Sequence, residues 1–458
     1  MSHWKSYLEE HRETFLHDLV QFLSIPSVST SPEHGEDVRR AAQWTADRIR
    51  RAGISDVRIM ETKGHPVVYA ERIESPDKPT VLIYGHFDVQ PAEPLELWMH
   101  PPFHPHIEDG KIYARAASDM KGNVLLSIVA CEALLQTRGM LPVNVKFLIE
   151  GEEEIGSPSL DGFIQQNKQL LACDLTISAD GGIGTREQPQ IGLSNRGLAG
   201  LQVRVKTADV DLHSGAGGYA PNALHGLISI LESLRDEEGR IQVDGFYEDV
   251  KPISDAERAI ITKMTPAFDA VMRQAGVKAS FGEPEYRPVE RSVARPTLEI
   301  NGMWGGFQGQ GVKTVIPHEA FAKITCRLVA NQDPEKIREL VKAQIYRVAP
   351  DYVDVFVEDL PGSAYPYQLP AEHTSVVTLQ RILEQTTGKR VKFERSGGTV
   401  PVMGMLRQTL GVETITVGAS QKDERAHAPN EFLRLENFYW LQEVVCMYLE
   451  ELPGALRP

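Results

Sequence analysis

Short hydrophobic runs alternate with amphipathic stretches over the first part of the chain. The runs Val81–Tyr84, Val143–Ile149 and Leu175–Ser178 have the length and continuity of buried strands. Val38–Ala52 and Asn123–Leu135, which precede two of these runs, have apolar residues at helical spacing. Strands separated by helices predict an α/β layer with a mostly parallel central sheet.

The pattern changes after about residue 197. Leu201–Lys206 and Phe321–Val329 alternate between apolar and polar residues, as half-buried strands do. Asn222–Leu234 and Pro334–Val348 follow them as amphipathic helices. This order predicts a smaller α+β domain with an exposed sheet face.

The earlier pattern returns near the end of the chain, where Glu372–Leu452 contains helix, strand and helix again. We therefore predict one α/β domain made of residues 1–196 and 370–458, interrupted by a smaller domain at 197–369. The charged, proline-rich segment 236–296 remains unassigned to helices or strands.

Metal-ligand side chains directly follow four of the predicted strands. They are His86, Asp88, Glu150, Glu152, Glu153, Glu154, Asp180 and, in the loop after Val412–Val417, His427. The carboxyl ends of parallel strands meet at one edge of an open sheet, where such proteins bind ligands. Asp119, just before the helix at Asn123–Leu135, is a further candidate.

Imidazole and carboxylate groups without thiolates suit zinc, manganese or cobalt in a hydrolytic site. The four cysteines are far apart and form no CxxC pair. Two imidazoles and several carboxylates exceed the needs of one ion, so we predict a metal pair that shares a carboxylate. Taken singly, each residue has an ordinary alternative: His86 in the core, Asp119 as a helix cap, Asp180 in a turn, the glutamates on a solvated face.

The composition excludes several other classes of protein. A formal charge of −15 opposes binding to nucleic acids or anionic membranes. We find no run of about 18 apolar residues and no signal-peptide pattern. These features predict a soluble cytoplasmic protein without a nucleic-acid or membrane partner.

Nine short segments, in order along nearly the whole chain, resemble one known family. They are YGHFDVQP (84–91), ASDMKG (117–122), EGEEEIGS (150–157), SAD (178–180), DLHSG (211–215), KTVIP (313–317), CRLV (326–329), SGGTVPV (396–402) and HAPNE (427–431). The chain is similar to the carnosinase and cytosolic dipeptidase branch of the two-zinc aminoacylase-like metallopeptidases. This resemblance implies a zinc-peptidase α/β domain interrupted by a lid and dimerisation domain.

The resemblance also implies a ligand set for the metal pair. His86 and Asp180 would each bind one metal, Glu154 and His427 the other, and Asp119 would bridge both. A cis peptide bond often follows the bridging aspartate in this family. Zinc would be the metal, with manganese or cobalt as alternatives.

Further residues receive catalytic or substrate-binding roles from the same resemblance. Asp88 would hydrogen-bond the His86 imidazole, and Glu153 would be the general base. His213 would stabilise the oxyanion and Arg327 would bind the free carboxylate of the substrate. A backbone-lined wall near that carboxylate would come from Gly397, Gly398 and Thr399.

The implied reaction is hydrolysis of a dipeptide by a metal-bridging hydroxide. The partners would be a small peptide substrate and a second copy of the chain, joined through the 197–369 domain, which would swing as a lid. Three alternatives stay open: an N-acyl-amino-acid amidohydrolase or desuccinylase, a carboxypeptidase acting on longer chains, and a catalytically inactive binding protein.

Overall fold

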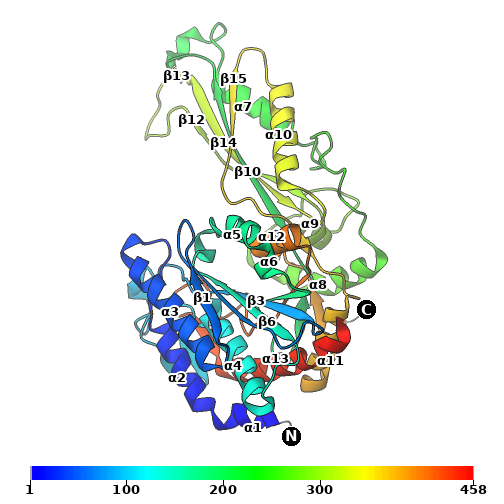
Figure 1. The fold of residues 1–458 in the computed structure, drawn as a ribbon. Coiled ribbons are helices and arrows are strands. Elements are labelled where there is room, and N and C mark those ends of the chain that lie inside the picture. The colour runs from blue at the N-terminus through cyan, green and yellow to red at the C-terminus, as the bar shows by residue number, and fades with distance from the viewer. Residues whose placement is uncertain (1–2, 457–458) are drawn as a thin grey trace. The chain divides into compact units, whose positions relative to one another are not determined.

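The computed structural model describes residues 3–456 of the chain. The outermost residues of the predicted α/β domain, 1–2 and 457–458, lie outside the described residues. Figure 1 shows the course of the chain through two compact units, which are treated separately below.

The two units divide the chain close to the predicted boundaries, with one exception. The first unit runs to Leu193 and includes Leu369–Phe393 and the chain from Met405 onwards. The second unit consists of Ser194–Gln368 and Glu394–Gly404. The prediction had placed this last segment in the α/β domain.

Hydrogen bonds explain why residues 394–404 belong to the second unit. The Arg196 amide donates to the Gly398 carbonyl over 2.7 Å, and the Arg395 guanidinium is paired with Glu257. Periodicity within a segment does not reveal such long-range contacts, so the predicted bounds did not separate this segment from the α/β domain.

A six-stranded sheet forms the centre of the first unit, in the order β1–β2–β6–β3–β7–β18. The strands are β1 (Asp56–Met60), β2 (Val67–Arg72), β3 (Thr80–His86), β6 (Asn144–Glu150), β7 (Leu175–Ser178) and β18 (Thr414–Thr416). The neighbours β6, β3, β7 and β18 are parallel, whereas β2 is antiparallel to both β1 and β6. The predicted mostly parallel sheet is confirmed, and β1 and β2 are additions to it.

Helices accompany this sheet and bury its central strands. They are α1 (His3–Glu10), α2 (Arg12–Leu23), α3 (Gly35–Arg51), α4 (Gly122–Arg138), α5 (Leu160–Gln166), α6 (Lys168–Leu171), α11 (Thr374–Thr387) and α13 (Leu435–Ala455), while α12 (Pro401–Leu410) crosses the boundary between the units. The helix α4 packs against α13, α1 and α2 and is buried along most of its length. All residues of β6 are buried, including the polar Asn144, Lys146 and Glu150 among its apolar residues.

Short strands complete the first unit. They are β4 (His106–Glu108), β5 (Lys111–Tyr113) and β19 (Phe432–Arg434), which form a three-stranded sheet, and the pair β8 (Gln190–Gly192) and β17 (Lys392–Glu394). Because β5 pairs with β19, the β4–β5 hairpin lies beside the chain that leads into α13.

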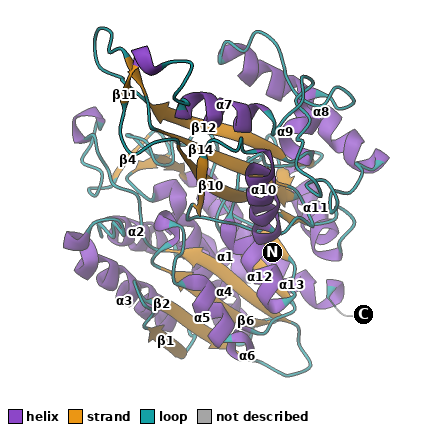
Figure 2. Cartoon of the chain, turned by 90° about the horizontal axis from the view of Figure 1, so that it is seen from above, coloured by secondary structure: helices purple, strands orange, loops and turns teal. Residues whose placement is uncertain are grey.

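The second unit contains a four-stranded antiparallel sheet in the order β12–β14–β10–β15. Its elements are β9 (Ser194–Asn195), β10 (Gly197–Lys206), β11 (Leu212–His213), α7 (Ala223–Glu232), α8 (Asp255–Gln274), α9 (Pro288–Ala294), β12 (Thr297–Gly305), β13 (Val315–Ile316), β14 (Glu319–Leu328), α10 (Pro334–Val348), β15 (Asp354–Asp359) and β16 (Tyr367–Gln368). Figure 2 shows α7 and α10 beside this sheet, and both helices contribute to its hydrophobic core.

The unassigned segment 236–296 contains α8 and α9. The side chain of Ser254 caps α8 in a capping box with Glu257. The two helices form a small core of their own around Ile261, Val289 and Val293. The S-x-x-E pattern at 254–257 was therefore a helix signal that the hydrophobic pattern alone did not reveal.

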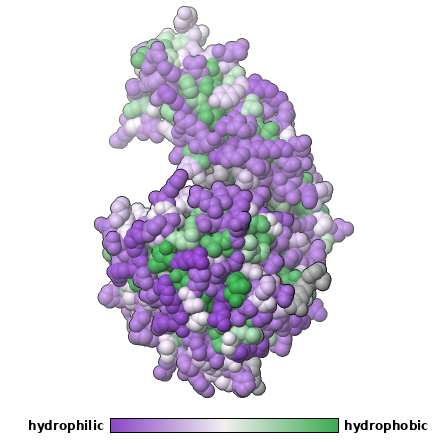
Figure 3. Space-filling view, in the orientation of Figure 1, coloured by the Kyte–Doolittle hydropathy of each residue, from purple (hydrophilic) through white to green (hydrophobic). Residues whose placement is uncertain are grey.

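Hydrophilic side chains dominate the face of the molecule seen in Figure 3, with scattered hydrophobic patches between them. Within residues 3–456, no helix combines the length and the apolar character needed to cross a membrane.

Candidate metal centre

The strand register of the first unit brings candidate ligands to one edge of the sheet. His86, the last residue of β3, lies opposite Glu150 at the end of β6. On the other side Tyr84 lies opposite Ser178, so Asp180, two residues further on, follows β7 at the level of His86. This is the carboxyl edge that the sequence predicted for the site.

His86, Asp119 and Asp180 form a first group whose ligand atoms all lie within 4.8 Å of one another. His86 Nε2 lies 3.3 Å from Asp119 Oδ1. The His86 side chain is fully buried. Asp119 belongs to the Ala117–Lys121 turn, which directly precedes α4. The peptide bond after Asp119 is cis, as the resemblance implied.

Asp119, Glu154 and His427 form a second group with the same spacing of 4.8 Å or less. His427 Nε2 lies 3.0 Å from Asp119 Oδ2 and 3.0 Å from Glu154 Oε2. One carboxylate oxygen of Asp119 therefore faces each histidine. A carboxylate shared in this way is the arrangement that a metal pair requires.

Two buried ligand atoms have no hydrogen-bond partner among the described residues: His86 Nε2 and Glu154 Oε1. A buried polar atom without a partner costs about 1–3 kcal/mol, so such atoms are rare unless a ligand satisfies them. One atom belongs to each group. Nitrogen and carboxylate donors with these two unpaired atoms fit two divalent cations.

Asp88 contacts the imidazole of His86 mainly through its backbone. His86 Nδ1 lies 3.1 Å from the Asp88 carbonyl oxygen and 3.4 Å from its carboxylate. Since a carbonyl only accepts, Nδ1 carries the proton and Nε2 is left free for a metal. The Asp88 carboxylate accepts hydrogen bonds from the amides of Glu153 and Glu154 over 3.2 and 3.0 Å, so it also orients the glutamate turn.

The contacts of the glutamate run distinguish its members. Glu150 accepts from the hydroxyls of Tyr84 and Ser157, and Glu152 accepts from the amides of His65 and Ser159. Both are buried and engaged in the fold.

Glu153 differs from these glutamates because its carboxylate faces the metal groups. Its Oε2 lies 3.9 Å from His86 Nε2. Burial raises the pKa of Glu153, and the negative charges of Asp180 and Glu154 raise it further, whereas His86 lowers it. A carboxyl group with a raised pKa beside a metal centre is suited to exchange a proton with substrate or water.

The pKa values of the ligands reflect an excess of buried negative charge. Burial raises the pKa of Asp180, and the neighbouring Asp119 carboxylate adds to the effect. Hydrogen bonds to Asp119 and Glu154 raise the pKa of His427 to about 10. Burial lowers the pKa of His86, but Asp119 and Asp88 outweigh it and raise the pKa. Bound cations would replace these protons as the compensating charge.

Sequence reasoning missed a buried carboxylate that holds the backbone at Asp119. Glu431 is fully buried and accepts hydrogen bonds from the amides of Ala116, Ser118 and Asp119 over 3.0–3.1 Å. It is also paired with the Arg115 guanidinium over 2.6 Å. Glu431 is the last residue of the HAPNE segment, so the motif contained the signal although no role was assigned to it.

The sequence profile of peptidase family M20/M25/M40 matches residues 82–451, which include every residue of the two groups. The chain belongs to peptidase family M20/M25/M40. The resemblance drawn from the nine short segments is thereby confirmed, and the fold is that of this family.

This M20 peptidase is similar to two dipeptidases and to one carboxypeptidase of known structure. Human Beta-Ala-His dipeptidase is 27% identical over 94% of this chain and 89% of its own. The Cys-Gly metallodipeptidase dug1 of Schizosaccharomyces pombe is 28% identical over 98% of this chain and 97% of its own. The solved structure of the M20 metallo-carboxypeptidase Sso-CP2 from Sulfolobus solfataricus has a TM-score of 0.82 at 34% identity, covering 96% of this chain and 99% of that one.

The remaining predicted residues of this M20 peptidase lie in the second unit. His213 is exposed, and its Nδ1 accepts the Gly215 amide over 3.0 Å, so the proton of the neutral ring is on Nε2. Arg327 Nη1 donates to the Thr399 hydroxyl over 2.5 Å. Gly397 and Gly398 adjoin that threonine, so Arg327 and the predicted wall are contiguous.

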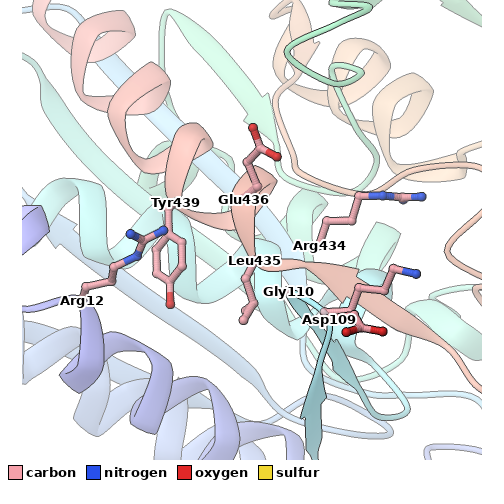
Figure 4. A pocket seen from close by; sticks show the side chains of 8 residues that line it. Arg12, Asp109, Gly110, Arg434, Leu435, Glu436 and Tyr439 are labelled. Atoms are coloured by element: carbon pink, nitrogen blue, oxygen red, sulfur yellow. The ribbon is translucent and has the colours of Figure 1, made fainter.

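Figure 4 shows a pocket of the first unit. It is lined by Arg12, Asp109, Gly110, Lys111, Arg434, Leu435, Glu436 and Tyr439. The Arg12 guanidinium lies 3.6 Å from the centre of the Tyr439 ring and closes one side. None of the predicted ligands lines this pocket, so it has no part in the metal centre.

Proposed function

We propose that this M20 peptidase is a metal-dependent dipeptidase. The observation that supports this most is the position of Asp119, whose two oxygens face His86 and His427 in two overlapping ligand groups. The dipeptidase names of the full-length relatives support the choice of substrate.

The proposed roles of the ligands follow from these groups. His86 and Asp180 hold one ion, Glu154 and His427 hold the other, and Asp119 bridges them. The ions, when bound, activate a water molecule and polarise the scissile carbonyl group. We assign zinc to both positions, with manganese or cobalt as alternatives, because the donors are imidazole and carboxylate.

Glu153 is the proposed general base. It is a neighbour of a ligand, its carboxylate is not held by the fold as those of Glu150 and Glu152 are, and it lies 3.9 Å from His86. It takes a proton from the attacking water and transfers that proton to the leaving amine.

Residues of the second unit are proposed to bind the free carboxylate of the substrate and the oxyanion formed at the scissile bond. The Arg327 guanidinium binds the free carboxylate, with Gly397, Gly398 and Thr399 beside it. The Nε2–H of His213 donates to the oxyanion. We also propose that the second unit joins two chains in a homodimer, as the resemblance implied, and that the enzyme is cytoplasmic, as its composition predicted.

The deciding experiment compares substrates on the metal-reconstituted enzyme. Carnosine, Cys-Gly, N-acetyl amino acids and tripeptides are assayed in parallel, with and without a chelator. We expect chelator-sensitive cleavage confined to the dipeptides. Turnover of the N-acetyl compounds instead would indicate an amidohydrolase, and absence of turnover with metals bound would contradict the proposal.

A carboxypeptidase is the second candidate, favoured by the 34% identity to the carboxypeptidase from Sulfolobus solfataricus. It would remove the C-terminal residue from longer peptides, also through a free carboxylate. A ladder of products from a pentapeptide would establish this candidate, whereas an intact pentapeptide would exclude it.

A further inference from the structure

A third group of metal-ligand side chains lies outside the proposed catalytic pair. The ligand atoms of His100, His106 and Glu108 all lie within 4.8 Å of one another. These residues belong to the first unit and to the segment that precedes β5. None of them is part of the groups around Asp119.

Local structure accounts for the convergence of these side chains. His106 and Glu108 are the first and third residues of β4, so their side chains project on the same face of that strand. The His100 ring stacks on the His106 ring with centroids 3.7 Å apart. His106 Nε2 and Glu108 Oε2 are 3.9 Å apart, beyond hydrogen-bonding distance, which leaves space for an ion between them.

The backbone around these side chains is held firmly. The Met99 amide donates to Asn430 Oδ1 over 2.7 Å, and the Asn430 side-chain amide donates to the Leu97 carbonyl over 2.9 Å. The Arg115 amide donates to the Pro102 carbonyl over 2.9 Å. Together with the β4–β5 pairing, these bonds fix both segments that supply ligands.

We propose that His100, His106 and Glu108 bind a third divalent transition-metal ion. Two imidazoles and one carboxylate favour zinc, nickel or copper over magnesium or calcium. In a tetrahedral zinc site neighbouring ligand atoms are about 3.4 Å apart, so binding would turn the stacked His100 and His106 rings until a nitrogen of each ring faces the ion. His106 and Glu108 are 42% and 59% exposed, so the ion exchanges with solvent and keeps water among its ligands.

Metal binding here would connect the loop before β4 to the β4–β5 hairpin. Asn430, whose side chain holds that loop through Leu97 and Met99, lies between His427 and Glu431 in sequence. An occupied site therefore stabilises the surroundings of the catalytic loop without contacting substrate. The proposal does not depend on the dipeptidase activity.

The test measures zinc content of the stripped full-length protein after equilibration with buffered zinc. We expect three ions per chain in the wild type, two in His106→Gln and three in His104→Gln. His104 is a matched control because it is exposed on the same segment and is absent from the group. Equal zinc content in His106→Gln and the wild type would overturn the proposal, as would loss of an ion in His104→Gln alone.

The comparison remains informative if the catalytic pair fails to bind. In that case the wild type would hold one ion and His106→Gln none, so failure of the two proposals can be distinguished. A second measurement is hydrogen exchange of residues 97–113, which zinc should slow in the wild type and leave unchanged in His106→Gln. Zinc-independent exchange in both proteins would also contradict the third site.

Discussion

The sheets of the two units differ in how far helices cover them. In the first unit, helices bury β6 completely, and its carboxyl edge carries the metal groups. In the second unit, α7 and α10 cover one face of the sheet, and the residues of β15 alternate between half-buried and exposed. The uncovered face carries stacked aromatic rings such as Trp304 and Phe321, with Arg204 over Phe321.

The two units also differ in how firmly they hold their candidate functional side chains. The candidate ligands of the first unit are held by buried partners, as Asp119 is held by Glu431. The candidate substrate-binding residues of the second unit, His213 and Arg327, are on or near the surface. A metal pair requires positions fixed to a fraction of an ångström, whereas a substrate carboxylate tolerates adjustment.

Asp119→Ala should have the largest effect on the first unit, because one substitution removes a candidate ligand from both metal groups. We expect loss of both metals and of measurable turnover, an effect larger than the ~10–100-fold that loss of an outer hydrogen-bond partner causes. Metal content by mass spectrometry and peptidase assays measure it. Asp161→Ala, an exposed aspartate of α5, is the control and should leave both unchanged. Full metal content in Asp119→Ala would refute the shared ligand.

Glu153→Gln separates catalysis from metal binding within the same unit. The substitution removes the proton acceptor and leaves the ligand groups intact, so kcat should fall by about 10²–10⁴-fold with metals retained. Steady-state kinetics and metal content are measured on the same sample. Glu152→Gln is the contrasting variant, because Glu152 accepts backbone hydrogen bonds and should change stability more than kcat. Metal loss in Glu153→Gln would shift the assigned roles to a neighbouring glutamate.

A pair of phenylalanine substitutions compares the two sheets directly. Phe147 in β6 is completely buried, whereas Phe356 in β15 is 46% exposed. Phe147→Ala should lower the free energy of unfolding of the first unit by about 3–5 kcal/mol, while Phe356→Ala should cost the second unit about 1 kcal/mol or less. Urea denaturation with hydrogen exchange of peptides from each unit measures both. Equal costs would mean that another surface covers β15 in solution.

Glu431→Gln tests whether a buried carboxylate positions Asp119, the proposed bridging ligand. The amide side chain keeps the size but weakens the bonds to three backbone amides and to Arg115. We expect metal affinity to fall by about 10–100-fold. Zinc titration with a competing chelator measures it, and excess zinc should restore kcat. Glu436→Gln, exposed at the start of α13, should behave as wild type.

The strands of the first unit could be predicted from the sequence because buried strands are rich in apolar residues. Largely apolar runs identified β3, β6 and β7, and three of the residues that follow these runs, His86, Glu154 and Asp180, lie in the metal groups. The partner of Asp119 could not be found this way. Glu431 is 312 residues away in the chain, and only the fold brings its carboxylate to the Asp119 amide.

The second unit was harder to predict for physical reasons. Its helix α8 buries only Ile261 strongly, so its apolar pattern is faint, and the capping box at Ser254 was the clearer signal. The segment 394–404 was predicted with the α/β domain, because its attachment to the second unit depends on hydrogen bonds to Arg196 and Glu257 that its own sequence does not reveal. Half-covered elements and long-range polar contacts leave little trace in local periodicity.

Arg327→Lys should have the smallest effect of these substitutions and concerns the candidate substrate-binding residues of the second unit. The substitution keeps the positive charge but removes the planar fork that can bind a carboxylate through two hydrogen bonds. One such bond contributes about 0.5–1.5 kcal/mol, so KM for a free dipeptide should rise by roughly 2- to 12-fold with kcat little changed. C-terminally amidated dipeptides should not distinguish the variant from the wild type. Arg204→Lys, on an outward-facing position of β10, is the control for a general effect on the sheet. An equal rise in KM for free and amidated substrates would mean that Arg327 supports the second unit without binding the carboxylate.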